Sequence, residues 1–382
     1  MENYGRAAAV VNLSHVGGNI GIVKSMVTPG TRVMAVVKAN GYGHGIYEVS
    51  QTAINAGADW LGVATVMEGV FLRRWNITIP ILVLSPVFEE EYENLIINKL
   101  TSTIFSSRAA EKLSHVAGYL EQTASVHIKI DTGMNRVGYN AQNPEAAVRA
   151  AAEIKKIAGM PGINVQGIYS HFATSDSDSA YAREQFAHFR HILDVIEKMG
   201  LHIPIRHISN SGGILGFREF DLDMVRAGVL TYGLAPSSTH EGALEMAKLG
   251  FLPALTLKSR VAHVKTVKAG QSVGYSRNFF AESDLEVATI PLGYGDGISR
   301  ALSNRGQVLI GGQICPVIGN VCMDQFMVDA TGAGAKVRDE VILIGDSGGH
   351  RIWAEDVAFW QKSINYEVTT GISERFPRFY VQ

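Results

Sequence analysis

Near the N-terminus, a lysine closes an otherwise apolar segment. Lys38 follows the run VMAVV at residues 33–37. Burial of an amine lowers its pKa and frees its lone pair for attack on a carbonyl carbon, as in Schiff-base chemistry. A lysine at a strand end can also extend its ammonium group to solvent, and the position of Lys38 alone is compatible with both interpretations.

The loop after Lys38 is rich in small residues and reads ANGYGHG over residues 39–45. Its glycines let the backbone approach a ligand closely, and Tyr42 could place a hydroxyl on a phosphate group. The spacing of the glycines is not that of the G-x-G-x-x-G loop of dinucleotide-binding proteins. The segment is therefore a candidate binding loop without a dinucleotide signature.

Two later segments carry cationic or titratable side chains at the end of an apolar run. Arg136 lies in a segment that also holds Lys129 and Asp131, and its guanidinium could donate to a phenolic oxygen or a carboxylate. His171 ends the run at residues 165–171. The alternatives are a solvated turn of mixed charge and a hydrogen-bonded structural histidine.

Small polar residues in two further segments could bind a phosphate group. Ser209–Gly213 reads SNSGG and Arg226–Val229 reads RAGV. Small residues expose backbone N–H groups to an anion, and barrels frequently build phosphate sites after their seventh and eighth strands. A polar turn and a structurally paired arginine are the alternative interpretations.

Elements that could position these residues alternate along the first two-thirds of the chain. Short, continuous, β-branched runs are typical of strands buried on both faces of a parallel sheet. The expected strands are Arg32–Lys38, Trp60–Val66, Ile79–Ser85, Ser102–Ser106, Ser125–Asp131, Val165–His171, Ile203–Asn210 and Asp223–Thr231. Helical spacing marks Pro144–Ala158 and Ala180–Met199. Eight strand–helix units predict an α/β fold with a (β/α)8 TIM barrel, and an open doubly wound sheet is the alternative.

From about Leu252 the pattern becomes β-rich, with glycine-containing turns and no long helix before Ala354–Lys362. This predicts a second, mainly β domain. The boundary falls near Ser238–Leu252, so we assign residues 1–242 to the barrel and residues 243–382 to the β domain.

Composition excludes several classes of protein. The chain has 382 residues, a formal net charge of −2, 18% charged and 46% apolar residues, which is ordinary for a globular protein and gives no reason to expect a nucleic-acid partner. The N-terminus lacks the order of a signal peptide and no apolar run is long enough to span a bilayer, so we expect a cytoplasmic protein without a membrane partner. The two cysteines do not have the spacing of a zinc site, and we expect no metal.

The string AVVKANGYGHG at residues 35–45 resembles the cofactor-attachment motif of alanine racemases, a family of pyridoxal 5′-phosphate (PLP) enzymes with a TIM barrel and a β domain. The resemblance continues over nearly the whole chain. It implies that Lys38 holds PLP as a Schiff base and that the barrel is the PLP-binding domain.

The resemblance also assigns roles to other residues of the barrel. Arg136 would contact the phenolic oxygen of PLP and the substrate, and Lys129 matches a lysine that is often carbamylated. His171 would stack under the pyridine ring and support a catalytic tyrosine, and Arg226 would face the pyridine nitrogen. The remaining cofactor-binding residues implied are Tyr42, Asn210, Ser211, Gly228, Val229 and Tyr366.

In the β domain, Tyr275 in the segment QSVGYSR matches a tyrosine that reaches the PLP of the partner subunit and acts as a base. Lys38 and Tyr275 would then serve opposite faces of the α-carbon. A tyrosine has a pKa of about 10 in water, so it must be lowered for this role. Tyr294 matches a residue at the active-site entrance, and the backbone of Met323 would contact the substrate carboxylate.

Residues of the access corridor match less completely. Asp176 and Arg300 match corridor residues of the family, and Tyr366 would also narrow the entrance. Position 320, commonly arginine in the family, is Asn320 here, so the corridor loses a cation.

The function implied is an isomerase: a homodimeric alanine racemase with shared active sites that interconverts L- and D-alanine by a two-base mechanism and supplies D-alanine for peptidoglycan. A racemase for serine or several small amino acids is the close alternative. A non-catalytic PLP-binding protein of cofactor homeostasis is the alternative from another class, and it would resemble only the barrel. Decarboxylases of related architecture use other motifs.

Overall fold

The computed structural model describes residues 4–382, which form two compact units. One consists of Gly17–Gly41 and Ile46–Thr231 and is called the barrel unit here. The other, the β unit, consists of residues 4–16, Tyr42–Gly45 and Tyr232–Gln382. In sequence, helix α1 (Leu13–Met26) and the short segment α2 (Lys38–Tyr42) run from one unit into the other.

The barrel unit contains eight parallel strands, each overlapping one of the eight expected ranges. They are β2 (Arg32–Val36), β3 (Trp60–Val63), β4 (Ile81–Val83), β5 (Ser102–Ile104), β6 (Ala124–Asp131), β8 (Ile163–Tyr169), β9 (Ile205–His207) and β10 (Met224–Ala227). They pair in the orders β10-β2-β3-β4 and β5-β6-β8-β9, and a parallel bridge from Leu82 to Thr101 links β4 to β5. The last strand, β10, pairs with the first, β2, and the amides of Asp223 and Arg226 donate to the carbonyls of Arg206 and Ser209 beside β9. The ring of strands is therefore closed, which confirms the barrel and excludes the open sheet.

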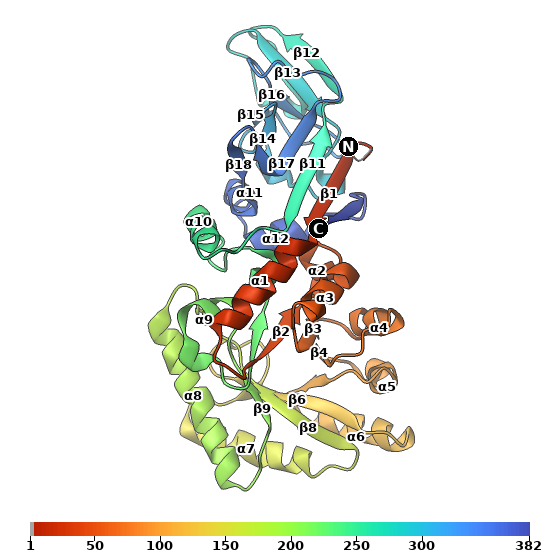
Figure 1. Ribbon diagram of the computed structural model, residues 1–382, viewed down its shortest axis with the longest axis vertical. Coiled ribbons are helices and arrows are strands. Elements are labelled where there is room, and N and C mark those ends of the chain that lie inside the picture. The colour runs from red at the N-terminus through yellow and green to blue at the C-terminus, as the bar shows by residue number, and fades with distance from the viewer. Residues whose placement is uncertain (1–3) are drawn as a thin grey trace. The chain divides into compact units, whose positions relative to one another are not determined.

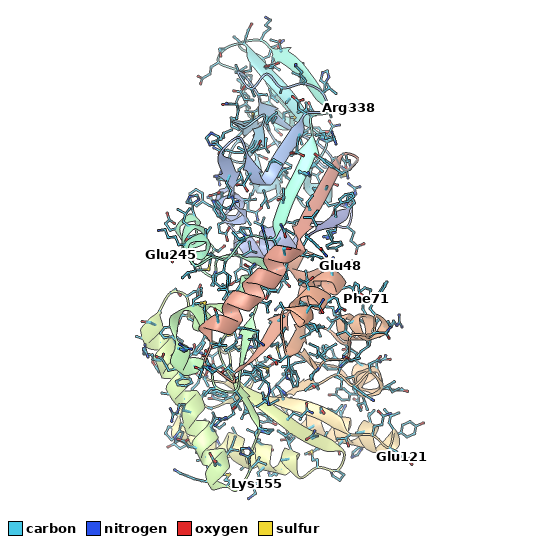
Figure 2. The ribbon with its side chains drawn as sticks, viewed as in Figure 1. Glu48, Phe71, Glu121, Lys155, Glu245 and Arg338 are labelled. Carbon is cyan, nitrogen blue, oxygen red and sulfur yellow. The ribbon has the colours of Figure 1, made fainter. Side chains whose placement is uncertain are left out.

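Helices cover the outside of these strands (Figure 1). They are α3 (Ile46–Asn55), α4 (Val66–Arg74), α5 (Tyr92–Ile97), α6 (Ser107–Tyr119), α7 (Pro144–Ala158), α8 (Ser179–Lys198) and the short α9 (Ser211–Gly216). The two expected helices are confirmed as α7 and α8, which begin where Asn143 and Asp178 cap their first backbone N–H groups. Charged side chains such as Lys155 on α7 lie on the outer surface (Figure 2).

The β unit is built on a ten-stranded sheet that is antiparallel except at one edge, where β1 (Ala7–Asn12) pairs in parallel with β19 (Arg378–Val381). Its other strands are β11 (Leu255–Arg260), β12 (His263–Val267), β13 (Leu285–Ile290), β14 (Gln307–Ile310), β15 (Gln313–Ile318), β16 (Phe326–Asp329), β17 (Glu340–Ser347) and β18 (His350–Ile352). The predicted mainly β domain is thereby confirmed. Its first strand comes from the N-terminus, through the antiparallel pairing of β1 with β11.

Three helices accompany the sheet: α10 (His240–Lys248), α11 (Ala354–Gln361) and α12 (Asn365–Thr370). The expected helix after residue 354 is α11, whereas α10 lies within the stretch that the sequence suggested as a boundary. No helix in the described part of the chain combines the length and the apolar character needed to cross a membrane.

Candidate active site

Candidate residues of the barrel unit gather at the carboxyl ends of its strands. Lys129 lies near the end of β6, His171 follows β8, and Arg226 lies near the end of β10. The expectation that Lys38 ends its strand was wrong, because β2 stops at Val36. The backbone becomes left-handed from Ala39 onward, so Lys38 lies where the loop begins.

The loop after Lys38 adopts a conformation that non-glycine residues disfavour. Ala39, Asn40 and Gly41 have φ of 51°, 52° and 59° with ψ near 50°, a left-handed helical turn. The Asn40 side chain accepts a hydrogen bond from the amide of Ile46 at 2.9 Å, which closes the loop. Strain of this kind persists only where surrounding contacts fix the backbone.

Glu68, which the sequence did not single out, fixes this turn from the neighbouring helix. Its Oε1 accepts a hydrogen bond from the amide of Ala39 at 2.7 Å, and its Oε2 accepts one from Ala64 at 2.7 Å. Glu68 also forms the capping box of α4 with Thr65. One carboxylate therefore ties the residue after Lys38 to the start of α4.

The pKa of Lys38 is lowered by burial and, next, by the charge of Arg136, while Glu68 opposes the shift. Lys129 is buried, and burial and the charges of Arg226 and Arg136 hold its pKa well below its usual value. Burial, and after it the charges of Arg226, Lys129 and Arg136, hold the pKa of His171 well below its usual value. The guanidinium of Arg136 is exposed and makes no hydrogen bond to residues 4–382. Its positive charge therefore acts on the neighbouring titratable groups, while its N–H donors stay available for a ligand.

Arg226 is buried inside the barrel and firmly held. Its Nη2 donates to the carbonyl oxygens of Ser170 and Ile208, both at 2.8 Å, and to Nδ1 of His171 at 3.0 Å. Its Nη1 donates to Nδ1 of His207 at 2.8 Å. Burial lowers the pKa of Arg226 to about 10, so the group remains a cation at neutral pH.

The contacts of Arg226 determine the tautomers of two buried histidines. Because Nδ1 of His207 accepts from a guanidinium, its ring proton lies on Nε2, which donates to Nδ1 of His127 at 2.9 Å. Burial and the charge of Arg226 lower the pKa of His207 well below its usual range and that of His127 to about 3. Both rings are therefore neutral, and the chain of donors ends at Nε2 of His127, which is buried without a partner among the described residues.

The two segments predicted to bind phosphate meet in the structure. Ser211 Oγ accepts hydrogen bonds from the amides of Gly228 at 3.0 Å and Leu230 at 3.4 Å. The Asn210 side chain instead caps α9, through a bond from the amide of Gly213 at 3.0 Å. Val229 follows Gly228 directly and is buried.

The remaining candidates lie in the β unit. Tyr42 is buried, its ring centroid is 6.3 Å from that of Tyr366, and burial raises its pKa. Tyr275 is 72% exposed and sits in a tight turn in which Gly274 has φ of 76°. The Tyr294 turn pairs with the Met323 turn, through a bond from the amide of Gly295 to the carbonyl of Met323 at 2.9 Å.

The predicted corridor residues differ in exposure, and Tyr366 is half-buried. Asp176 lies in the barrel unit and Arg300 in the β unit, and both are exposed. Asn320 is buried, and its Nδ2 donates to the carbonyl of Tyr275 at 2.8 Å. Both cysteines are free thiols, and no cluster of three or more metal-binding side chains occurs in residues 4–382.

Comparisons with known proteins cover both parts of the chain. Residues 11–236 match the family model of the alanine racemase N-terminal domain, and residues 254–380 match that of the C-terminal domain. The chain is 41% identical to the alanine racemase of Desulforamulus reducens over 375 residues, 98% of each chain. The solved alanine racemase of Clostridium difficile 630 superposes with a TM-score of 0.91 at 34% identity, covering 100% of this chain and 97% of that one. A structure of the same enzyme in complex with cycloserine gives a TM-score of 0.88 at 34% identity, covering 100% of this chain and 96% of that one.

Both domain models match in order and together span most of the chain. The first relative is 41% identical over nearly the full length of both chains. The chain belongs to the alanine racemase family.

Proposed function

We propose that this chain is an alanine racemase that uses PLP, acts as a homodimer, interconverts L- and D-alanine and supplies D-alanine for peptidoglycan. The observation that carries the proposal is the Lys38 amine, whose pKa is lowered by burial and by Arg136, in a chain that matches both alanine racemase domains. A lowered pKa increases the fraction of the amine that is unprotonated and able to act as a nucleophile or a base.

The residues present fit PLP by their chemistry. When bound, PLP supplies an aldehyde that an amine can hold covalently and a ring that withdraws electrons from the α-carbon of an amino acid. Lys38 would hold the aldehyde carbon. Arg226 carries five N–H groups, and its bonds to the described residues use only Nη1 and Nη2, which leaves Nε–H for an acceptor such as the pyridine nitrogen.

Arg226 would also limit how strongly the pyridine ring of PLP withdraws electrons. A guanidinium donates hydrogen bonds and does not give up its proton, so a ring nitrogen facing it stays unprotonated. The rigid support of Arg226 by two carbonyl oxygens and His207 favours this fixed role. We infer that weaker electron withdrawal favours return of a proton to the α-carbon over side reactions such as transamination.

For the phosphate, we propose Ser211, Gly228 and Val229 of the barrel unit and Tyr42 and Tyr366 of the β unit. The bond between Ser211 and the amide of Gly228 supports a joint role for the two small-residue segments. Asn210 contributes by capping α9 and thereby holding Ser211 in place.

Two bases would act on the α-carbon from opposite faces. Lys38 would move the proton on one face, and Tyr275 from a second copy of the chain would move it on the other. The 72% exposure of Tyr275 supports a role toward another copy. His171 donates from Nε2, because its Nδ1 accepts from Arg226, and is proposed to orient that tyrosine hydroxyl.

We propose Arg136, the backbone of Met323 and Tyr294 as substrate-binding residues. The unused donors of Arg136 suit a carboxylate. Lys129 is the proposed carbamylation site, because its lowered pKa favours the neutral amine, the form that reacts with carbon dioxide. The resulting anion would neutralise part of the positive field of Arg136 and Arg226.

Borohydride reduction of the purified enzyme followed by peptide mapping tests the anchor. The pyridoxyl group is expected on Lys38, and its recovery on another lysine would remove the assignment. Racemisation assays with alanine, serine and other small amino acids distinguish an alanine racemase from a broader enzyme. The absence of any racemisation by PLP-loaded protein would favour a non-catalytic PLP-binding protein.

Mixing inactive Lys38→Ala and Tyr275→Ala proteins tests the shared site. Heterodimers should regain one intact site and therefore activity. No recovery after subunit exchange has been demonstrated would contradict the assignment of Tyr275 to the partner.

A further inference from the structure

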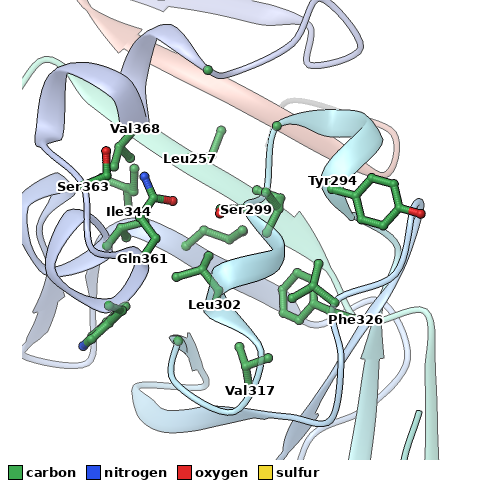
Figure 3. Close-up of a pocket in the computed structure, with 18 of the residues that line it drawn as sticks. Leu257, Tyr294, Ser299, Leu302, Val317, Phe326, Ile344, Gln361, Ser363 and Val368 are labelled. Atoms are coloured by element: carbon green, nitrogen blue, oxygen red, sulfur yellow. The ribbon is translucent and has the colours of Figure 1, made fainter. Parts of the chain in front are cut away.

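The β unit contains a partly open, largely apolar cavity of about 400 Å³, and among the described residues Tyr294 is the one member of the proposed site in its lining (Figure 3). Buried side chains such as Leu257, Leu302, Val317 and Ile344 form its walls. Protein interiors rarely leave voids much larger than a water molecule, whereas sites for small molecules commonly measure 300–1,000 Å³. The cavity is therefore of ligand size.

Most polar groups of the cavity lie where α11 is linked to α12, while Ser299 and Gln307 line it from other segments. Gln361, Lys362, Ser363 and Glu367 line this side, and Lys362 and Glu367 are exposed. Ser363 donates a hydrogen bond to Glu367, so that carboxylate already has a partner. The two exposed charges are of opposite sign, and the walls behind them would desolvate an ion without compensation. These features select an uncharged molecule with one polar group at the mouth.

Two wall segments carry residues of the proposed site. The turn Tyr294–Asp296 continues into Gly297 and Ile298, and α12 carries Tyr366 and is followed by Gly371. The Tyr294 ring itself points away from the centre of the cavity (Figure 3). A molecule in the cavity would therefore contact the back of both segments and leave the Tyr294 ring on the outer side.

These two segments are packed backbone against backbone. Gly297 has φ of 96°, and a Cβ there would lie 2.1 Å from the carbonyl oxygen of Gly371. The amide of Ser373 donates to the carbonyl of Asp296 at 3.2 Å. The segments are thus expected to move as one body when the wall behind them is displaced.

We propose that this cavity is a binding site for a small, uncharged, largely apolar molecule, and that its occupant shifts the Tyr294 turn and α12 together and so regulates admission of the amino acid. The regulatory part rests on the proposed function, whereas the binding part does not.

Binding can be measured directly on the PLP-loaded enzyme by isothermal titration calorimetry with 2-naphthylmethanol as the probe. Wild-type protein should bind it with a submillimolar Kd, and the charged analogue 2-naphthoate should bind about tenfold more weakly or worse. Val317→Phe and Val357→Phe, which fill the cavity from different walls, should each weaken binding at least about tenfold. Val337→Phe makes the same change at an exposed position outside the cavity and should bind like wild type.

The regulatory part predicts that the alcohol changes the KM for alanine of the wild-type and Val337→Phe enzymes but not of the filled variants. No binding by wild type up to the solubility limit, or undiminished binding by both filled variants with native unfolding transitions, would overturn the site. Binding without a change in KM would overturn the regulation alone. If the enzyme binds the probe yet racemises no amino acid, the proposed function fails and the site stands.

Discussion

Asn320 holds the backbone of Tyr275, with its Nδ2 2.8 Å from the Tyr275 carbonyl oxygen. Its Oδ1 accepts a bond from the side chain of Asn278 at 2.7 Å, so both ends of the buried amide are used. The turn it supports is strained, with φ of 63° at Ser276 and 49° at Arg277. The departure from arginine at position 320 thus removes a cation but also supplies a brace for the proposed catalytic tyrosine.

Asn320→Asp should therefore impair the Tyr275 turn although the side chain keeps its shape. An acceptor would face the Tyr275 carbonyl in place of a donor, which should lower the free energy of unfolding by about 1–3 kcal/mol. Hydrogen exchange at residues 275–278 should accelerate and kcat for alanine should fall. Asn94→Asp, at an exposed position, is the matched control; equal exchange in both variants would show that Asn320 is no brace.

Glu68→Ala should loosen the loop that carries Lys38. The amides of Ala39 and Ala64 lose their acceptor and α4 loses its capping box, which should cost about 1–3 kcal/mol of the free energy of unfolding. The pKa of Lys38 should fall further, because Glu68 raises it in the native protein. The pH dependence of Lys38 modification by trinitrobenzenesulfonate in cofactor-free enzyme measures this, with the exposed Glu93→Ala as control. An unchanged profile would contradict the electrostatic role.

The neutral histidines of the barrel interior should make the enzyme acid-sensitive. His127 and His207 have lowered pKa values in the folded protein, so below about pH 6.5 the unfolded chain binds protons that the folded chain does not. The contribution of the two neutral histidines to the free energy of unfolding should be fully present above that pH. Below it, the free energy of unfolding should fall by about 1.4 kcal/mol per pH unit for each histidine. Urea unfolding at pH 7.5, 6.0 and 5.0 checks the slope. His127→Phe should have a shallower slope than wild type, and an identical slope would argue that His127 is protonated when folded.

Gly297→Ala should be strongly destabilising. The backbone there is left-handed and the added methyl group would collide with the Gly371 carbonyl at 2.1 Å, so a loss above about 2 kcal/mol is expected. Gly332 also has positive φ, 81°, but open space around it, so Gly332→Ala isolates the cost of the dihedral angle alone. Similar thermal unfolding of the two variants would contradict the tight packing of the two wall segments.

Much of the fold could be read locally. Each barrel strand is a short β-branched run, and α7 and α8 carry their own capping residues, so sequence neighbours suffice to predict them. The motif around Lys38 and the residues near the ends of later strands gave the candidate site, whose residue roles stay predictions. In a parallel barrel, the carboxyl ends of all strands lie on the same face, so residues at these ends come together without any further signal in the sequence.

Tertiary structure decided what depends on distant partners. The pairing of β1 with β11 and β19 joins residues some 250 and 370 positions apart, and nothing in the residues 7–12 encodes those partners. Glu68, His127 and His207 had no local signature, because a carboxylate on a helix and histidines in apolar strands are ordinary until their contacts are known. From the sequence, Asn320 meant only the loss of a cation. Its buried hydrogen bonds in the structure show that it also supports the Tyr275 turn. Local pattern determines which elements form, whereas hydrogen bonds across long sequence separations exist only once the chain has closed around them.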